Sequence, residues 1–503
     1  MSPVEPPLHP DACYSALKAR DARFDGTFFT GVTSTGIYCR PVCKVRTPRR
    51  ENCRFFAHAA QAEGAGFRPC LRCRPELAPQ ALRWSINDAS GILAQQAARL
   101  LDEPEAWGAQ APSIELLAAR LGVSDRHLRR IFEAQLGVSP LQYLQTRRLL
   151  AAKQLLADTD LPVTQVALAS GFASVRRFNA AFSAHYGLNP TQLRRQGASG
   201  DAGSTVRLGY RPPYDVAAML GFFRTRAIAG MEFVEGNVFG RTLALDAGDD
   251  VLHGWLTAEF DADHCQVLLR VSEGLRAALP LLIRRARAAF DLDADPHAIN
   301  ARLHASFPLG DGLRVPGSLS GYELAVRAVL GQQITVAAAR TLAQRLVERF
   351  GTPVQTPFPA LRRAFPQPEV LAAAEGDALG QLGIVRQRQA AIVAIARAVA
   401  ERRVQLHAGA DVQATIAALK ELPGIGDWTA QYIAMRALRW PDAFPAGDVA
   451  LQKALGVQER AQPAREAEAA SQPWKPWRSY AVIRAWSTLA APAHAAPAAG
   501  VPR

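Results

Sequence analysis

The stretch LPGIGDWTA, residues 422–430, decides the architecture of the second half of this chain of 503 residues. It places a short glycine-containing turn between two helical patterns. Glycine amides at such a turn can approach a phosphate with no side chain in the way, and the helix that follows turns its positive dipole end toward an anion. A Gly-x-Gly by itself is equally typical of a tight helix–helix turn. The stretch therefore predicts a helical domain with Gly424 and Gly426 at its phosphate contact.

The segments around this turn carry a longer pattern. AVLGQQIT (328–335), the turn with its helix (422–438), FPAGDVALQKALG (444–456) and WKPWRSYAVIRAW (474–486) follow one another in order. Together they resemble the AlkA-type 3-methyladenine DNA glycosylases of the helix-hairpin-helix superfamily, over most of 316–490. The resemblance implies an all-helical domain that removes alkylated purines from DNA.

The resemblance assigns the essential carboxylate to Asp448, twenty positions after Trp428. Breaking an N-glycosidic bond builds positive charge on the sugar, which a nearby carboxylate stabilises while it helps a water to attack. Two rivals are less well placed: Asp442 falls before the motif and Asp427 lies in the hairpin.

Trp428 fills the position where strand-cutting relatives carry a lysine, so we expect a monofunctional hydrolase without a Schiff base. The flipped base would stack on Trp428, Tyr432 and Trp486. Gln333 stands at the position where members of the family insert a side chain, the wedge, into the gap that the flipped base leaves. The relatives use an apolar side chain there. The resemblance also implies a monovalent cation on hairpin carbonyls. No cysteine follows Cys265, which excludes the iron–sulfur cluster of some relatives.

A small mixed region precedes this domain. YDVAAMLGFFRTRAI (214–228) predicts a helix, and four strand-like runs follow between 230 and 273. A further helix is expected after them, with an interruption at Pro280. The run 211–228 with GMEFVEG (230–236) resembles the N-terminal subdomain of the same glycosylases.

The front of the chain holds two close cysteine pairs, Cys39-Arg-Pro-Val-Cys43 and Cys70-Leu-Arg-Cys73. Two such pairs joined by a long loop can close a tetrahedral zinc site, and a purely structural zinc module is one interpretation. The surrounding stretch 24–76, with GIYCRP (36–41), RFFA (54–57) and AGFRPC (65–70), resembles the N-terminal domain of Ada-type alkylation-response proteins.

This second resemblance implies that Cys39 accepts a methyl group from a methylated DNA phosphate while Cys43, Cys70 and Cys73 remain zinc ligands. Direct displacement at carbon needs a good nucleophile, and a zinc ligand is held as thiolate. Methylation removes one negative charge, so the site should then repel DNA less and bind it more tightly. The candidate phosphate contacts around the site are Arg40, Lys44, Arg46, Arg49, Arg50, Arg68, Arg72 and Arg74.

Two helix-turn-helix patterns follow, at 113–140 and 163–190. Each has a glycine turn, a serine cap and a basic second helix. The repeat, with its helical spacer, resembles the AraC-type DNA-binding domain. The residues expected to contact DNA are Arg126, His127, Arg130, Arg176 and Arg177.

The net charge of +13 favours a polyanionic partner, and its excess is uneven. Residues 1–200 carry 25 basic and 16 acidic side chains, against 33 and 29 in the rest. Seven cysteines are too few for a disulfide scaffold, and neither a signal peptide nor a membrane span is evident. We expect a cytoplasmic, DNA-associated protein whose partners are double-stranded DNA, a specific promoter and, as for other regulators of this type, RNA polymerase.

The expected fold is multidomain and mainly α. Its domains are 1–82 (small zinc-binding α/β domain), 83–197 (AraC-type double helix-turn-helix), 198–205 (linker), 206–300 (α+β subdomain), 301–490 (all-α helix-hairpin-helix glycosylase) and 491–503 (disordered tail). The alternative is a transcription regulator whose second half binds DNA without catalysis. Asp448 argues against it, because DNA binding alone does not require that carboxylate.

Overall fold

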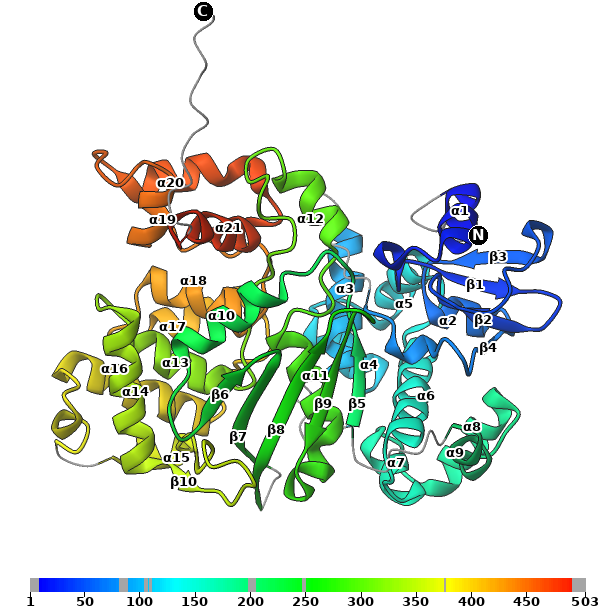
Figure 1. The fold of residues 1–503 in the computed structure, drawn as a ribbon, viewed down its shortest axis with the longest axis horizontal. Helices are drawn as coiled ribbons and strands as arrows, with labels where there is room; N and C mark the ends of the chain where they lie inside the picture. The colour runs from blue at the N-terminus through cyan, green and yellow to red at the C-terminus, as the bar shows by residue number, and fades with distance from the viewer. Residues whose placement is uncertain are drawn as a thin grey trace, which may run out of the picture.

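The computed structural model describes residues 9–80, 89–103, 107, 111–197, 205–246, 250–374 and 377–490. The chain is multidomain and mainly helical, with two larger sheets, which confirms the expected fold class (Figure 1). The front domains lie on the right of this view and the C-terminal helices on the left, with a five-stranded sheet between them. The predicted tail at 491–503, most of the predicted linker and the boundary at 82/83 lie outside the described residues.

The first domain is a four-stranded sheet of order β3-β1-β2-β4 with two helices. Its elements are α1 (Pro10–Ala19), β1 (Phe29–Val32), β2 (Ile37–Cys39), β3 (Cys53–Phe56), α2 (Ala59–Gly64) and β4 (Arg68–Pro69). Strands β2 and β4 are parallel, with Tyr38 opposite Pro69. This register brings the chain after β2 and the chain after β4 to the same end of the sheet, where both cysteine pairs lie.

Seven α-helices among the described residues form the next domain, and serine residues cap several of them. They are α3 (Ala89–Asp102), α4 (Ile114–Arg120), α5 (Asp125–Leu136), α6 (Pro140–Asp158), α7 (Val163–Ala169), α8 (Val175–Tyr186) and α9 (Pro190–Gly197). The hydroxyl of Ser124 accepts from the amide of His127, and that of Ser174 from the amide of Arg177. Each bond satisfies an amide that the first helical turn leaves unpaired, so α5 and α8 begin where predicted.

The middle region is a five-stranded antiparallel sheet of order β5-β9-β8-β7-β6. Its elements are β5 (Thr205–Gly209), α10 (Val216–Arg226), β6 (Glu232–Glu235), β7 (Val238–Asp246), β8 (Val251–Asp261), β9 (Gln266–Val271) and α11 (Leu279–Ala289). Strand β5 was not predicted, and it begins at the last residue of the expected linker. The interruption expected at Pro280 is confirmed: a 3-10 helix (Glu273–Ala278) ends just before α11, and the proline lies in the first turn of α11, where its missing N–H costs nothing.

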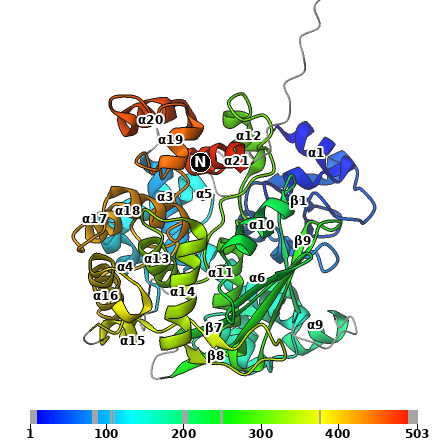
Figure 2. The same cartoon turned by 60° about the vertical axis from the view of Figure 1, so that its left-hand side comes forward.

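The last region is a helical bundle with one continuous apolar core. It consists of α12 (Pro296–Leu303), α13 (Gly321–Leu330), α14 (Val336–Phe350), the short pair β10 (Thr352–Pro353) and β11 (Arg363–Ala364), α15 (Pro368–Ala372), α16 (Arg386–Ala400), α17 (Val412–Lys420), α18 (Asp427–Arg436), α19 (Val449–Ala454), α20 (Pro463–Ser471) and α21 (Arg478–Ala490). Helix α10 contacts β6 and β7 on one side and α14 on the other, so it joins the sheet to the bundle (Figure 2). None of the described helices combines the length and apolarity that a bilayer span requires.

A fully buried arginine ties the front of the molecule to the middle sheet. Arg211 is 0% exposed, and its guanidinium donates to five backbone carbonyls. Those of Asp25 and of Pro79 and Gln80 belong to the first domain, and those of Asp293 and Ala294 follow α11. Because a buried cation needs partners for its donors, this cage makes the contact between the two parts specific.

Candidate functional sites

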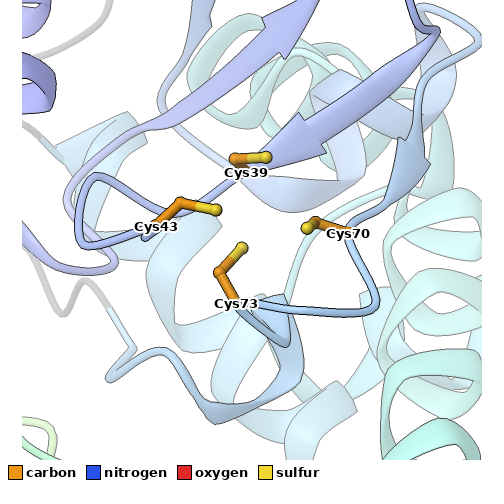
Figure 3. A group of neighbouring side chains, drawn as sticks. All are labelled: Cys39, Cys43, Cys70 and Cys73. Carbon is orange, nitrogen blue, oxygen red and sulfur yellow. The ribbon is translucent and has the colours of Figure 1, made fainter. Parts of the chain in front are cut away.

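The four paired cysteines form one cluster at the end of the first sheet. Cys39 ends β2, Cys43 follows in the next turn, and Cys70 and Cys73 come after β4. Their sulfurs all lie within 4.8 Å of one another and point toward a common centre (Figure 3). Four sulfurs around zinc, each at about 2.3 Å, stand about 3.8 Å apart, so the cluster fits a tetrahedral zinc ion. Cys39, Cys43 and Cys70 are buried, whereas Cys73 is half-buried.

The two other cysteines of this domain are separate from the cluster. The Cys53 thiol donates to the Arg49 carbonyl, and burial raises its pKa. Burial also raises the pKa of Cys13, to about 11. Neither sulfur belongs to the group of four that lie within 4.8 Å of one another.

Two arginines expected to reach DNA point inward instead. The Arg40 guanidinium pairs with the Asp25 carboxylate and donates to the Cys73 carbonyl at 3.0 Å. Arg74 pairs with Glu76 at 2.9 Å and with Asp158 of α6 at 2.6 Å. The expectation of a phosphate contact is wrong for these two, because buried carboxylates already occupy their donors. Lys44, Arg46, Arg49, Arg68 and Arg72 do not share this burial.

The basic residues of both second helices lie on an exposed face. Arg126 and Arg130 of α5 are exposed, and His127 is half-buried with its Nδ1 3.1 Å from an Arg130 nitrogen. Arg176 and Arg177 of α8 are exposed as well. The opposite faces of these helices bury Leu128, Phe132, Phe178 and Phe182. The basic side chains are thus free to meet a polyanion.

The hairpin between α17 and α18 has the geometry that its glycines predict. Gly424 has φ of +75°, a left-handed conformation, and an added Cβ would lie 3.1 Å from the Cβ of Ala391. A Cβ at Gly426 would meet nothing within 4 Å, and Gly426 caps the N-terminus of α18. The first glycine therefore lets the hairpin pack on α16, and the second leaves open space before a helix N-terminus.

Three helices bring Asp448 together with two of the predicted aromatic residues. One carboxylate oxygen of Asp448 accepts from the indole N–H of Trp428 at 2.9 Å. The other accepts from the indole N–H of Trp486 at 3.0 Å and from the Leu451 amide at 2.7 Å. The rings of Trp428 and Tyr432 are stacked at 5.4 Å, and that of Trp486 is 6.4 Å from Tyr432. A carboxylate thus lies at the edge of an aromatic surface.

The rival carboxylates are engaged elsewhere. Asp442 is buried in a two-pronged salt bridge with Arg478, at 2.8 and 2.9 Å. Asp427 is exposed at the start of α18 and pairs with Lys420 at 3.1 Å. Neither touches the Trp428–Tyr432 stack in the way that Asp448 does.

Two side chains of α10, Phe222 and Arg226, lie next to Arg436, which also lies over the ring of Tyr432, and sequence reasoning missed them. The Arg226 guanidinium lies 3.8 Å from the ring centre of Phe222, and that of Arg436 lies 4.7 Å from the same ring. Burial pushes the pKa of Tyr432 upward, but the charges of Arg436 and Arg226 outweigh it and leave that pKa below its ordinary value. Burial lowers the pKa of Arg226 to about 10. The spacing of Phe222 and Arg226 on one helical face was the available signal.

Gln333 occupies the turn between α13 and α14. It has φ of +53°, the left-handed region that few residues other than glycine adopt. Its side chain is exposed, as a residue that enters DNA must be.

The fold and these sites define a zinc-binding, double helix-turn-helix protein joined to a base-excision glycosylase of the helix-hairpin-helix type. Four family profiles match the chain: the metal binding domain of Ada (12–76), a helix-turn-helix domain (117–196), the AlkA N-terminal domain (205–320) and the HhH-GPD superfamily base excision DNA repair protein (326–478).

The whole chain has a counterpart among known proteins. It is 38% identical over 510 residues to a probable bifunctional transcriptional activator/DNA repair enzyme AlkA of Mycobacterium tuberculosis, covering 97% of this chain and 99% of that protein. The chain belongs to this family of bifunctional transcriptional activators and DNA repair enzymes.

Each half also has a separate relative in Escherichia coli. DNA-3-methyladenine glycosylase 2 is 34% identical over 281 residues, which is 56% of this chain and 96% of that enzyme. The bifunctional transcriptional activator/DNA repair enzyme Ada is 34% identical over 191 residues, which is 38% of this chain and 50% of that protein. The Ada-type, helix-turn-helix and AlkA-type resemblances predicted from sequence are confirmed.

Proposed function

We propose that this protein senses and repairs alkylated DNA with two reaction centres. Cys39 takes a methyl group from a DNA methylphosphotriester, and the methylated front half activates a promoter. The second half hydrolyses the N-glycosidic bond of alkylated purines such as 3-methyladenine. The observation that carries the second activity is the Asp448 carboxylate held by two indole N–H groups beside a stacked aromatic pair.

The front reaction needs a single nucleophile. A bound zinc ion would keep the four cysteine sulfurs deprotonated at neutral pH. The Cys39 sulfur attacks the methyl carbon of the triester, an S–C bond forms as the C–O bond breaks, and the phosphodiester leaves as an anion. No proton moves, so the site requires no acid or base. The close grouping of the sulfurs supports this role.

Methyl transfer would also act as the switch. The product thioether carries one negative charge fewer than the thiolate, so the front half repels phosphates less. Arg126, His127, Arg130, Arg176 and Arg177 are the proposed DNA contacts, with base readout at the starts of α5 and α8. RNA polymerase is the protein partner that an activator of this kind requires.

The salt dependence of promoter binding tests this assignment. Arg129 is exposed on α5 beside these residues. Replacing it together with Arg126, Arg176 and Arg177 by alanine should weaken promoter binding. It should also reduce the slope of log K against log salt, by about 0.9 for each phosphate that the variant no longer neutralises. Binding of the same variant to random duplex through the second half should change little. An unchanged promoter slope would contradict the assignment.

The second reaction proceeds by base flipping into the aromatic site. Trp428, Tyr432 and Trp486 would hold an electron-poor alkylated purine, with Phe222 and Arg226 at its margin. As the glycosidic bond breaks, positive charge grows on the sugar and the Asp448 carboxylate stabilises it. The indole at Trp428 cannot form a Schiff base, which makes the enzyme a monofunctional hydrolase.

The hairpin and Gln333 would hold the DNA around the flipped nucleotide. The amides at Gly424 and Gly426 grip a backbone phosphate, and Gln333 fills the gap that the base leaves. A monovalent cation on the hairpin carbonyls would strengthen this grip. The Gly424 carbonyl already accepts a hydrogen bond from Gln332, so a cation would use its second lone pair.

One experiment tests both reactions. The purified protein is incubated with methylated duplex DNA, and released bases and protein-bound methyl groups are measured by mass spectrometry. We expect 3-methyladenine in solution, one methyl group on Cys39 and no strand nick without heat or base. A methyl group on another ligand, such as the more exposed Cys73, would contradict the acceptor assignment. A coupled nick would contradict the monofunctional one.

The domain division is part of the proposal. We assign 1–82 to methyl acceptance, 83–197 to promoter binding, and 206–300 with 301–490 to excision. Ile228 and Met231 lie in the apolar core of the helical bundle, and Arg241 of β7 pairs with Glu323 of α13, which supports treating the last two as one catalytic unit.

A further inference from the structure

Gln332 and Gln333 are neighbours in the turn between α13 and α14, but their side chains have different surroundings. Gln333 stands at the left-handed position of the turn. The Gln332 side chain turns inward, where its amide nitrogen donates to the Gly424 carbonyl at 2.9 Å and to the Thr429 hydroxyl at 3.0 Å. Sequence alone does not distinguish the two amides.

The partners of Gln332 belong to the other element that would grip DNA. Gly424 lies in the hairpin, and Thr429 is a buried residue in the first turn of α18. The backbone carbonyl of Gln332 accepts from the Arg388 guanidinium of α16, the helix on which the hairpin packs. The turn between α13 and α14 is therefore fixed by hydrogen bonds that both the side chain and the backbone of Gln332 make.

We propose that Gln332 is a positioning residue that sets the distance between the wedge at Gln333 and the hairpin at Gly424. The primary amide suits this task, because its two N–H groups match one carbonyl and one hydroxyl acceptor. The residue that fills the gap left by the flipped base and the hairpin that binds the neighbouring phosphate must keep a fixed distance from each other. A displacement of about 1 Å can lower the reaction rate about a hundredfold.

This inference rests on the proposed excision activity, and it predicts a selective defect. Undamaged duplex is held by phosphate contacts and needs no wedge. A flipped nucleotide needs the wedge and the hairpin at the same time. Loss of the Gln332 hydrogen bonds should therefore lower the rate of excision and weaken binding to DNA that has a gap in its base stack. The affinity for undamaged duplex should not change.

The test compares Gln332→Met with a matched control, Gln344→Met. Methionine keeps the length of the side chain and removes both donors. Gln344 lies on α14, where its amide meets only Glu348 among the described contacts. For each protein we would measure the single-turnover release of 3-methyladenine, and dissociation constants for a duplex with a stable abasic-site analogue and for an undamaged duplex.

We expect Gln332→Met to lower the single-turnover rate about ten- to hundredfold. It should weaken abasic-analogue binding by a similar factor and leave undamaged-duplex binding and the melting temperature as in Gln344→Met. Thr429→Val should reproduce part of the loss, and Thr429→Ser, which keeps the hydroxyl, should recover it.

Two results would overturn the proposal. One is a Gln332→Met protein with wild-type excision and wild-type preference for the abasic analogue. The other is an equal loss on both duplexes, in this variant or in Thr429→Val, which would mean a general structural role. A wild-type protein that releases no base would instead refute the proposed glycosylase, and the ratio of the two dissociation constants would still test Gln332.

Discussion

The two proposed reaction centres of this molecule both gather anionic groups, but they are assembled in opposite ways. The front centre collects four sulfurs from two turns of one small sheet, all between positions 39 and 73. The rear centre places one carboxylate between indoles from α18 and α21, and α10 adds Phe222 from the neighbouring subdomain. A cysteine that reacts once needs only the neighbouring cysteines that share its metal ion. A carboxylate that stabilises a transient charge needs a cavity that holds the substrate against it.

The comparison predicts that the centres are chemically independent. Cys39→Ser should abolish methyl transfer completely, because a serine hydroxyl is neither a zinc ligand of comparable strength nor a competent nucleophile here. Base excision by the same variant should continue near the wild-type rate. The two activities are measured on one methylated duplex, and a parallel loss of excision would contradict independence.

Asp448→Asn is the complementary change at the rear centre. An amide has the same size but no charge, and it can accept from only one of the two indoles without turning its own N–H groups toward the other. Excision should fall by a factor of about 10² or more, while DNA affinity stays equal or rises slightly. Asp427→Asn, at the exposed rival, is the control and should retain excision.

Arg211→Met probes the contact that joins the two halves. The change leaves five backbone carbonyls without the donor that Arg211 supplies. The free energy of unfolding should therefore fall by about 3 kcal/mol. The readout is the first thermal transition of the full chain. Arg302→Met removes an exposed arginine that donates to the Lys475 carbonyl and should change little. Equal melting curves would show that the cage contributes no stability.

Trp486→Phe is the mildest change. It tests whether the hydrogen bond from the Trp486 indole is needed to position the Asp448 carboxylate. Phenylalanine keeps an aromatic ring but loses one of the donors to Asp448, so excision should fall about tenfold. Trp474→Phe removes a comparable indole bond, to Ser306, away from the site. If both variants excise at the same rate, the indole N–H of Trp486 does not position the carboxylate.

Much of the front half could be predicted because its signals are local. Short Cys spacings, the serine caps at Ser124 and Ser174 and the glycine turns each depend on a few neighbouring residues. The direction of the arginines could not be predicted in this way. Arg40 and Arg74 lie in the same basic sequence as Arg72, but only the folded chain shows that Asp25 and Asp158 turn them inward.

The sequence by itself determined the domain types and singled out the four cysteines that the fold brings together, since both depend on residue types at fixed spacing. The tertiary structure alone decided three further points: Phe222 and Arg226 reach the aromatic site, Arg211 joins the halves, and Gln332 rather than Gln333 faces the hairpin. The physical reason is the same in each case. Burial and hydrogen bonding between segments far apart in the sequence depend on how whole domains pack, and no local pattern of charge or hydrophobicity encodes that packing.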